Sequence, residues 1–247
     1  EVLARWRQPN GAILGPGDFI AEAEATGDIV DITKNLLLRI RKDLGSLYKD
    51  NRDLKLSVNL VGDHFASTDI VRDIQEIFCD QRNGIRFQQI QFEITERLPL
   101  KSIARARIIV KKLQQLGCRI LLDDAGTGHG SLTYLQELGL DVIKIDKSFI
   151  DTITETDTAS PIVETLIDLS KRMAMETIAE GVDRPCQLRY LRKRGVTAVQ
   201  GYLLSKPIAG GEYRILVANT KAKLHPALVP FVHTSTPRHA SPSAAAA

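Results

Sequence analysis

Cysteine is scarce in this sequence, and its spacing suits no common structural use. Cys79, Cys118 and Cys186 are the only 3 cysteines among 247 residues, and no two of them form a CxxC pair. An odd number of widely separated cysteines argues against a disulfide scaffold and against a cysteine-ligated zinc site. We therefore expect reduced, buried thiols inside an ordinary hydrophobic core.

Long apolar runs and a large net charge are also missing. No run approaches the 18 or so apolar residues that a membrane span needs, and no signal peptide opens the chain. The 33 Lys and Arg residues against 30 Asp and Glu residues give a net charge of +3. This excess is too small to indicate a DNA or RNA polymer, or a membrane surface, as a partner.

Short apolar segments alternate along the chain with longer amphipathic segments. The expected strands cover residues 1–6, 55–60, 90–95, 119–124, 142–146, 176–180 and 198–202. The expected helices cover residues 29–48, 70–81, 102–116, 131–138, 159–173, 185–194 and 211–219. This order is typical of parallel strands that are joined by crossover helices.

The fold class that follows is α/β, and the length suits a single barrel, which takes about 250 residues. We favour a (β/α)8 TIM-like barrel over an open doubly wound sheet, because no glycine-rich nucleotide fingerprint follows an early strand. The chain starts abruptly on a strand, so we expect the first of the eight strands to be missing from it. The domain is expected over residues 1–220, and residues 221–247, rich in Pro, Ser and Ala, are expected to form a flexible tail.

One face of several expected strands is polar, although both faces of a barrel strand are usually apolar. The polar residues fall toward the C-terminal ends of the strands, where α/β barrels carry their active sites. They are Glu1, Asn59, Glu93, Asp123, Asp124, Lys144, Asp146, Glu180 and Gln200.

Carboxylates dominate this set, and Lys144 is its only cationic side chain. If the carboxylates converge, their mutual repulsion in a partly dry cavity would cost many kcal/mol. A lattice of ion pairs around Lys144 alone would leave the charge unbalanced, so we infer bound divalent cations. Oxygen ligands suit hard ions such as Mg²⁺ or Mn²⁺.

An oxygen-lined cation site suits phosphoryl chemistry. Two ions about 3.5–4 Å apart can bind a phosphodiester oxygen, generate hydroxide from water and stabilise the leaving oxygen. Arg5 shares the first expected strand with Glu1 and could add a contact to phosphate through its planar guanidinium. It could equally pair with a neighbouring acid.

Eight motifs occur in order along the chain, and seven of them contain these residues. They are Glu1-Val2-Leu3-Ala4-Arg5-Trp6, Asp18-Phe19-Ile20, Ser57-Val58-Asn59-Leu60, Phe92-Glu93-Ile94-Thr95-Glu96, Asp123-Asp124-Ala125-Gly126-Thr127-Gly128, Lys144-Ile145-Asp146, Ala179-Glu180-Gly181-Val182-Asp183 and Gln200-Gly201-Tyr202. With them the sequence resembles the EAL domain family of bacterial cyclic di-GMP phosphodiesterases, from residue 1 to about residue 218.

The resemblance implies a modified (β/α)8 barrel that hydrolyses cyclic di-GMP to linear pGpG with two Mg²⁺ or Mn²⁺ ions. It implies that the first ion is held by Glu1, Asn59, Glu93 and Asp123, and the second ion with its water by Asp123, Asp124 and Glu180. Lys144 is implied to orient the attacking water, and Gln200 to help position it.

Three further positions are expected to contact the substrate, and a fourth is expected to anchor the loop that follows the aspartates. Arg5, together with Leu3 and Asp146, is expected to contact substrate. Glu96 resembles the glutamate that anchors the loop after Asp124, which couples the site to a dimer contact in the family. The resemblance further implies upstream sensor or signalling domains, a homodimer, and a cytoplasmic domain of a protein that can be anchored in the inner membrane.

Three departures from the family pattern affect the loops. Ala125 stands where phenylalanine is usual, His129-Gly130 where a tyrosine-serine pair is usual, and Asp183 where glutamate is usual. The loop after the aspartates is therefore expected to be looser, and its link to a dimer contact weaker. Two alternatives stay open: a catalytically weak or inactive domain that serves as a cyclic di-GMP receptor, and a metal-dependent hydrolase of another phosphodiester.

Overall fold

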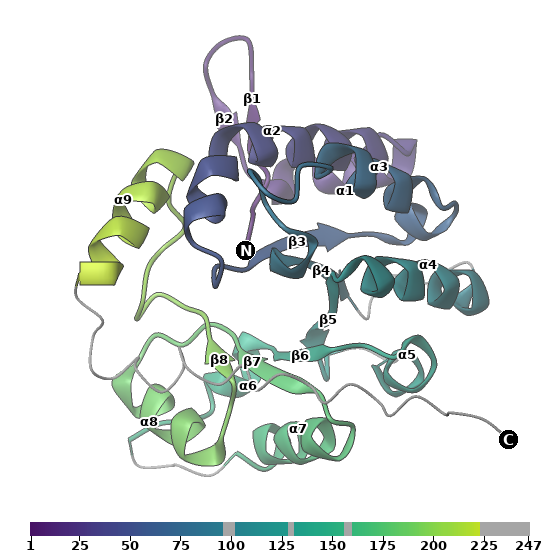
Figure 1. Ribbon diagram of the computed structural model, residues 1–247. Coiled ribbons are helices and arrows are strands. Elements are labelled where there is room, and N and C mark those ends of the chain that lie inside the picture. Colours follow the sequence, from purple (N-terminus) through teal and green to yellow (C-terminus); the bar gives the residue numbers. More distant parts are fainter. Residues whose placement is uncertain (96–101, 128–130, 156–159, 223–247) are drawn as a thin grey trace, which may run out of the picture.

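A curled parallel sheet of six strands forms the centre of the molecule (Figure 1). The computed structural model describes residues 1–95, 102–127, 131–155 and 160–222. The strands, adjacent in the sheet in chain order, are β3 (Leu56–Leu60), β4 (Ile90–Thr95), β5 (Arg119–Ala125), β6 (Val142–Ile145), β7 (Glu176–Ala179) and β8 (Ala198–Val199). Each strand therefore pairs with the next one in sequence, as the expected barrel requires.

Helices cover the outer side of this sheet (Figure 1). They are α1 (Ile20–Thr26), α2 (Ile29–Asp50), α3 (Asp69–Ile77), α4 (Ile103–Leu116), α5 (Ser131–Leu138), α6 (Lys147–Ile150), α7 (Pro161–Arg172), α8 (Pro185–Arg194) and α9 (Gly210–Ala222). Short 3₁₀ turns lie at Pro16–Asp18, Gly62–Phe65 and Phe87–Gln89. No described helix is both long and apolar enough to cross a bilayer.

Local signals fix the helix ends. The Ser102 side chain caps α4 by accepting from the Arg105 N–H at 3.3 Å, and Gly117 ends the helix with φ +106°. The helix expected over residues 70–81 ends earlier, at Ile77. The Asp80 carboxylate accepts from the N–H groups of Arg82 and Asn83, and this turn replaces the last helical turn.

The segment before β3 differs most from the expectation. A strand was expected over residues 1–6, but only Trp6–Arg7 (β1) has strand structure, and it pairs antiparallel with β2 (Ile13–Leu14). Residues ahead of β1 lie beside β3, where the Val2 N–H donates to the Ser57 carbonyl at 2.9 Å.

The apolar core lies between the sheet and its helices. Its larger part packs β3, β4 and β5 against α2, α3 and α4, and a second part packs β6 and β7 against α7 and α8. Residues 223–247 of the expected tail lie outside the described residues, and Lys221 and Ala222 belong to α9.

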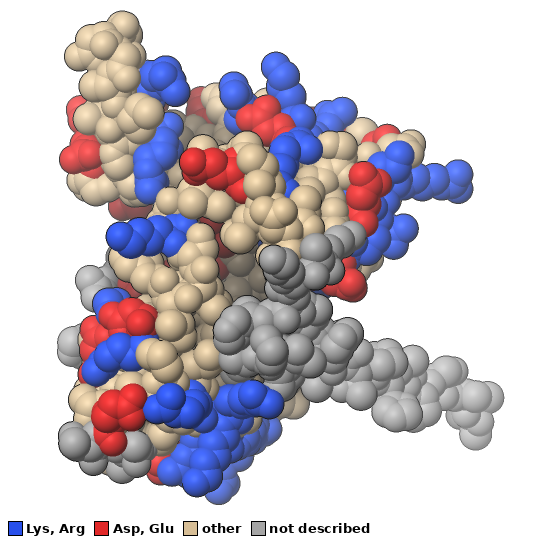
Figure 2. Space-filling model, turned by 90° about the vertical axis from the view of Figure 1, so that its left-hand side faces the viewer, with Lys and Arg blue, Asp and Glu red and all other residues tan. Residues whose placement is uncertain are grey.

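The surface carries both signs of charge side by side. Figure 2 shows Lys and Arg side chains gathered at the lower end of the face that carries α8, a helix that ends in Arg192, Lys193 and Arg194. Part of this charge is paired, because Arg189 contacts Glu155 at 3.0 Å and Arg194 contacts Glu164. Exposed ion pairs of this kind add little stability. Buried charged side chains are rarer than these surface pairs.

Candidate active site

The inner face of the sheet is polar in successive layers. Deep inside, the Ser57 hydroxyl of β3 donates to the Gln91 side chain of β4 at 3.2 Å. Two residues further along, Asn59 lies opposite Glu93 in the parallel register. Side chains two apart share a face of a strand, so the expected alternation correctly placed Asn59 and Glu93 together near the C-terminal ends.

Lys144 of β6 lies at the centre of the site. Its ammonium Nζ is 2.6 Å from Glu180 Oε1, 2.7 Å from Glu93 Oε2, 2.9 Å from Asp123 Oδ1 and 3.7 Å from Glu1 Oε2. Only 1% of its side chain is exposed. Residues from five separate segments therefore meet at one buried cation.

Glu1 joins the two ends of the curled sheet. The Asn59 amide of β3 donates to Glu1 Oε1 at 2.9 Å, and the Gln200 amide, just after β8, donates to Glu1 Oε2 at 2.9 Å. Both carboxylate oxygens of Glu1 thus accept from neutral amides, and the carboxylate spans the space between β3 and β8.

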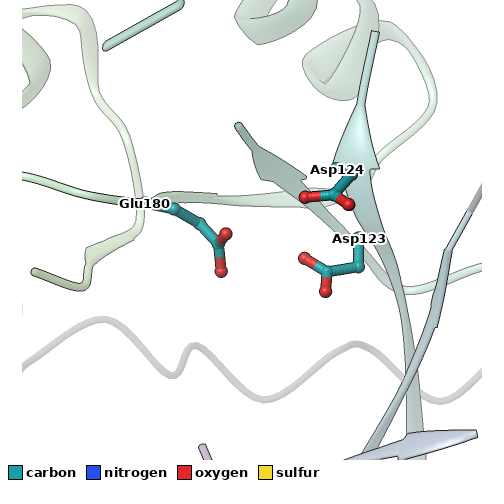
Figure 3. A group of neighbouring side chains, drawn as sticks. All are labelled: Asp123, Asp124 and Glu180. Carbon is teal, nitrogen blue, oxygen red and sulfur yellow. The ribbon is translucent and has the colours of Figure 1, made fainter. Parts of the chain in front are cut away.

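A bulge in β5 brings two consecutive aspartates to the site. In a regular strand Asp123 and Asp124 would point to opposite faces, but the register of β5 on β6 shifts between Leu122 and Ala125. Asp124 takes the left-handed conformation, with φ +54°. One ligand oxygen each from Asp123, Asp124 and Glu180 lie within 4.8 Å of one another, and Figure 3 shows the three side chains converging on one space.

The strain at Asp124 gives a testable prediction. Asn tolerates the left-handed region nearly as well as Asp, whereas Ala does not. Both variants remove the same charge, so we expect Asp124→Ala to have a free energy of unfolding about 1 kcal/mol lower than that of Asp124→Asn. Urea unfolding of the metal-free protein measures both, and equal stability of the two variants would contradict a conformational requirement at this position.

The electrostatics of the site are set by burial and by Lys144. Burial raises the pKa of Glu93 and that of Glu180 to about 7, in spite of the nearby ammonium. Burial would also raise the pKa of Glu1, but Lys144 and the hydrogen bonds from Gln200 and Asn59 lower it below its ordinary value. Burial opposes the charge on Lys144, yet the surrounding carboxylates raise its pKa.

The donor set fits hard divalent cations. Glu93 Oε1 is buried and accepts no hydrogen bond within the described structure. Asp123 Oδ1 and Glu180 Oε1 are also buried, and the Lys144 ammonium contacts them at 2.9 and 2.6 Å. Buried carboxylate oxygens without donors are costly, and oxygen-only ligands are those that Mg²⁺ and Mn²⁺ favour.

The remaining predicted positions lie at the edge of the cluster or away from it. Asp146 caps α6, accepting from the Ser148 N–H at 2.9 Å. Arg5 donates to the Ala4 carbonyl at 2.9 Å, and Leu3 is exposed. Glu96 lies outside the described residues.

The altered loop is only partly described. Ala125 is 1% exposed and pairs with Ile145 of β6, so the alanine sits in the packed core. His129 and Gly130 lie outside the described residues, so the expectation of a looser loop stays a prediction. Asp183 accepts from Lys147 at 3.5 Å and from Arg184 at 3.3 Å, which ties the loop after β7 to α6.

A contact that sequence reasoning missed joins the loops after β7 and β8. The Val182 N–H donates to the Gln200 carbonyl at 3.0 Å, and the Leu203 N–H donates to the Val182 carbonyl at 3.0 Å. Gly201 lies so close to Val182 that a Cβ on it would be 2.2 Å from the Val182 carbonyl oxygen. The sequence shows a glycine directly after Gln200, but it does not show that this glycine packs against the Val182 backbone.

Comparison with known proteins gives a consistent result. The EAL domain family matches residues 1–207. The probable cyclic di-GMP phosphodiesterase PdeN of Escherichia coli K12 is 39% identical over 84% of this chain, and the cyclic di-GMP phosphodiesterase NbdA of Pseudomonas aeruginosa is 34% identical over 84%. The chain spans only 40% and 26% of the lengths of these two relatives.

Solved structures agree with the sequence relatives. The MucR phosphodiesterase of Pseudomonas aeruginosa in its c-di-GMP complex superposes with a TM-score of 0.73 at 30% identity, covering 85% of this chain and 84% of that one. The EAL domain of Mycobacterium smegmatis DcpA gives a TM-score of 0.65 at 30% identity, with coverage of 74% and 82%. Both comparisons support the barrel that the alternation of strands and helices predicted.

Proposed function

The chain belongs to the EAL domain family, and from this we propose that it hydrolyses cyclic di-GMP to linear pGpG with the help of divalent cations. One observation carries the proposal: four carboxylates from separate segments meet at the buried Lys144 ammonium at the C-terminal end of the sheet. Burying four carboxylates around one ammonium destabilises the fold, whereas the same carboxylates can hold the cations that phosphoryl chemistry uses.

The residues divide into two groups that share Asp123. Glu1, Asn59, Glu93 and Asp123 would hold one ion, and Asp123, Asp124 and Glu180 the other. Bound Mg²⁺ or Mn²⁺ would lower the pKa of water and polarise the phosphodiester. Gln200 supports this arrangement from outside, because its amide holds Glu1 in place.

Lys144 and Glu180 are the groups suited to handle the water and its proton. Their side chains are 2.6 Å apart. We propose that Glu180 accepts the proton that the attacking water loses. Lys144, held charged by its neighbours, would donate hydrogen bonds that orient the water toward phosphorus.

The substrate and the setting follow from the family and its relatives. We propose that Leu3, Arg5 and Asp146 contact the dinucleotide, with Arg5 directed at phosphate. MucR is named as a bifunctional cyclase and phosphodiesterase. We propose that this chain is the cytoplasmic phosphodiesterase unit of a larger signalling protein, which can be anchored in the inner membrane. We also propose that the unit forms a homodimer, and that Glu96 couples the loop after Asp124 to the dimer contact.

Product release tests the proposal. With Mg²⁺ or Mn²⁺ the protein should convert cyclic di-GMP to pGpG, and Glu1→Ala and Lys144→Ala should each lower kcat by about 10²-fold or more. Lys171→Met is the matched control, because Lys171 is exposed near the end of α7 and pairs with Asp168 of the same helix, away from the site. Binding of the nucleotide without turnover would assign the chain to the receptor class, and turnover retained by both site variants would contradict the residue roles.

A further inference from the structure

Lys144 occupies an unusual position among the carboxylates. Its ammonium contacts Asp123 and Glu180, which would share one ion, and also Glu93 and Glu1, which would hold the other. One ammonium group therefore contacts proposed ligands of both ions. Its water-orienting role does not require contacts to both groups.

The Lys144 side chain is shielded from solvent, and its backbone is held in the middle of the sheet. β6 is paired on both sides, by β5 and by β7, and the Lys144 backbone lies in register with Ile178 of β7. The side chain is 1% exposed. A surface lysine could turn away from an arriving cation, but this one stays within the same cluster of oxygens.

We propose that Lys144 competes with divalent cations for the same carboxylate oxygens and thereby sets the affinity of the site for its ions. In the metal-free protein the ammonium acts as the resident counter-ion, and it keeps the acids together. When ions bind, the ammonium must give up part of its pairing and stand near like charge, which weakens ion binding. This inference rests on the proposed function, because it takes the acids to be metal ligands.

One feature of the site supports competition, and two others show which oxygen atoms remain open to an arriving ion. The Lys144 distances to Asp123 and Glu180 are those of contact ion pairs, so an ion bound to the same oxygen atoms meets the ammonium directly. Glu93 Oε1 is buried and accepts no hydrogen bond within the described residues, so one oxygen is left for a cation beside the lysine. Asn59 donates its amide N–H to Glu1, which leaves its carbonyl oxygen free of that contact.

Calorimetric titration of the metal-free chain with MnCl₂ at pH 8, without nucleotide, tests the inference. Lys144→Met removes the charge and keeps the length of the side chain, and we expect it to bind Mn²⁺ at least tenfold more tightly than the wild type, or about 1.4 kcal/mol. Lys171→Met, which removes an exposed charge near the end of α7, should bind within twofold of the wild type. The melting temperature of metal-free Lys144→Met should be lower than that of the wild type, and Mn²⁺ should raise it by more.

The outcomes separate this inference from the proposed function. Equal or weaker Mn²⁺ binding by Lys144→Met overturns the inference. Uptake by Lys144→Met alone, with none by the wild type, supports the inference and overturns metal-dependent hydrolysis by this chain, and uptake by neither overturns both. Should Lys144→Met fail to fold, Lys144→Gln, whose amide can donate to the same carboxylates, carries the same comparison.

Discussion

Glu180→Gln is expected to lower kcat about 10³-fold and, at the same time, to make the metal-free protein more stable. The loss of activity follows because the variant removes both a proposed ion ligand and the proton acceptor next to Lys144. The gain in stability follows because one buried charge leaves a cluster in which four carboxylates face a single ammonium. Few substitutions at a structural position would produce both effects together.

The pH dependence of that gain has a definite sign. The pKa of Glu180 is about 7 in the folded protein and 4.5 ordinarily, so between these values the folded state binds the extra proton. Wild-type stability therefore falls as the pH rises from 4.5 through 7, and Gln removes this loss. At about 1.4 kcal/mol per pH unit, and with part of the Lys144 pairing lost, we expect a gain of about 1–3 kcal/mol at pH 8 and none near pH 4.5.

Urea unfolding in EDTA at the two pH values measures the stability, and pGpG release measures kcat. Glu176→Gln is the matched control, because Glu176 lies at the other end of β7 and pairs with Arg119 at 2.8 Å. The control should lose up to about 1 kcal/mol and keep its activity. A Glu180→Gln protein that is less stable than the wild type at pH 8 would show that Lys144, and not repulsion among the acids, dominates the metal-free site.

The polar face of the strands was readable from sequence because a two-residue period leaves little choice. Once residues 55–60 and 90–95 are strands, Asn59 and Glu93 must share a face, and the parallel register puts them opposite one another. The same two-residue period places Lys144 of β6 on this polar face, two strands from β4. The ion-pair alternative was also partly right, since Lys144 does pair with the acids, but a single ammonium leaves the charge of the cluster unbalanced.

The parts that sequence could not predict depend on backbone that leaves the regular pattern. Strand periodicity gives Asp123 and Asp124 opposite directions, and only the bulge with its left-handed φ turns both toward Glu180. The first segment illustrates the reverse case. Its sequence has strand character, but the bond from the Val2 N–H to the Ser57 carbonyl does not extend into a ladder with β3, and the side chains of Asn59 and Gln200 hold Glu1 instead.

Gly201→Ala is expected to be the most damaging substitution outside the charged cluster. A Cβ at this position would lie 2.2 Å from the Val182 carbonyl oxygen and 2.3 Å from the Val182 nitrogen. These are backbone atoms of the loop that follows Glu180, so relief requires the two loops to separate. We expect a loss of about 3 kcal/mol or more in the free energy of unfolding.

The folded fraction of Gly201→Ala should also have a lower kcat, because the substitution displaces Gln200 and, through it, Glu1. Moving Gly201 moves Gln200, whose amide holds Glu1 at 2.9 Å, and a displacement of about 1 Å costs about 10² in rate. Gly195→Ala is the matched control: Gly195 also has a positive φ, +79°, but nothing lies within 4 Å of its Cβ position. It should lose only about 1 kcal/mol and keep full pGpG release. If the two variants behaved alike, the strain of a positive φ would account for both, and the joined loops would not be what fixes Gln200 against Glu1.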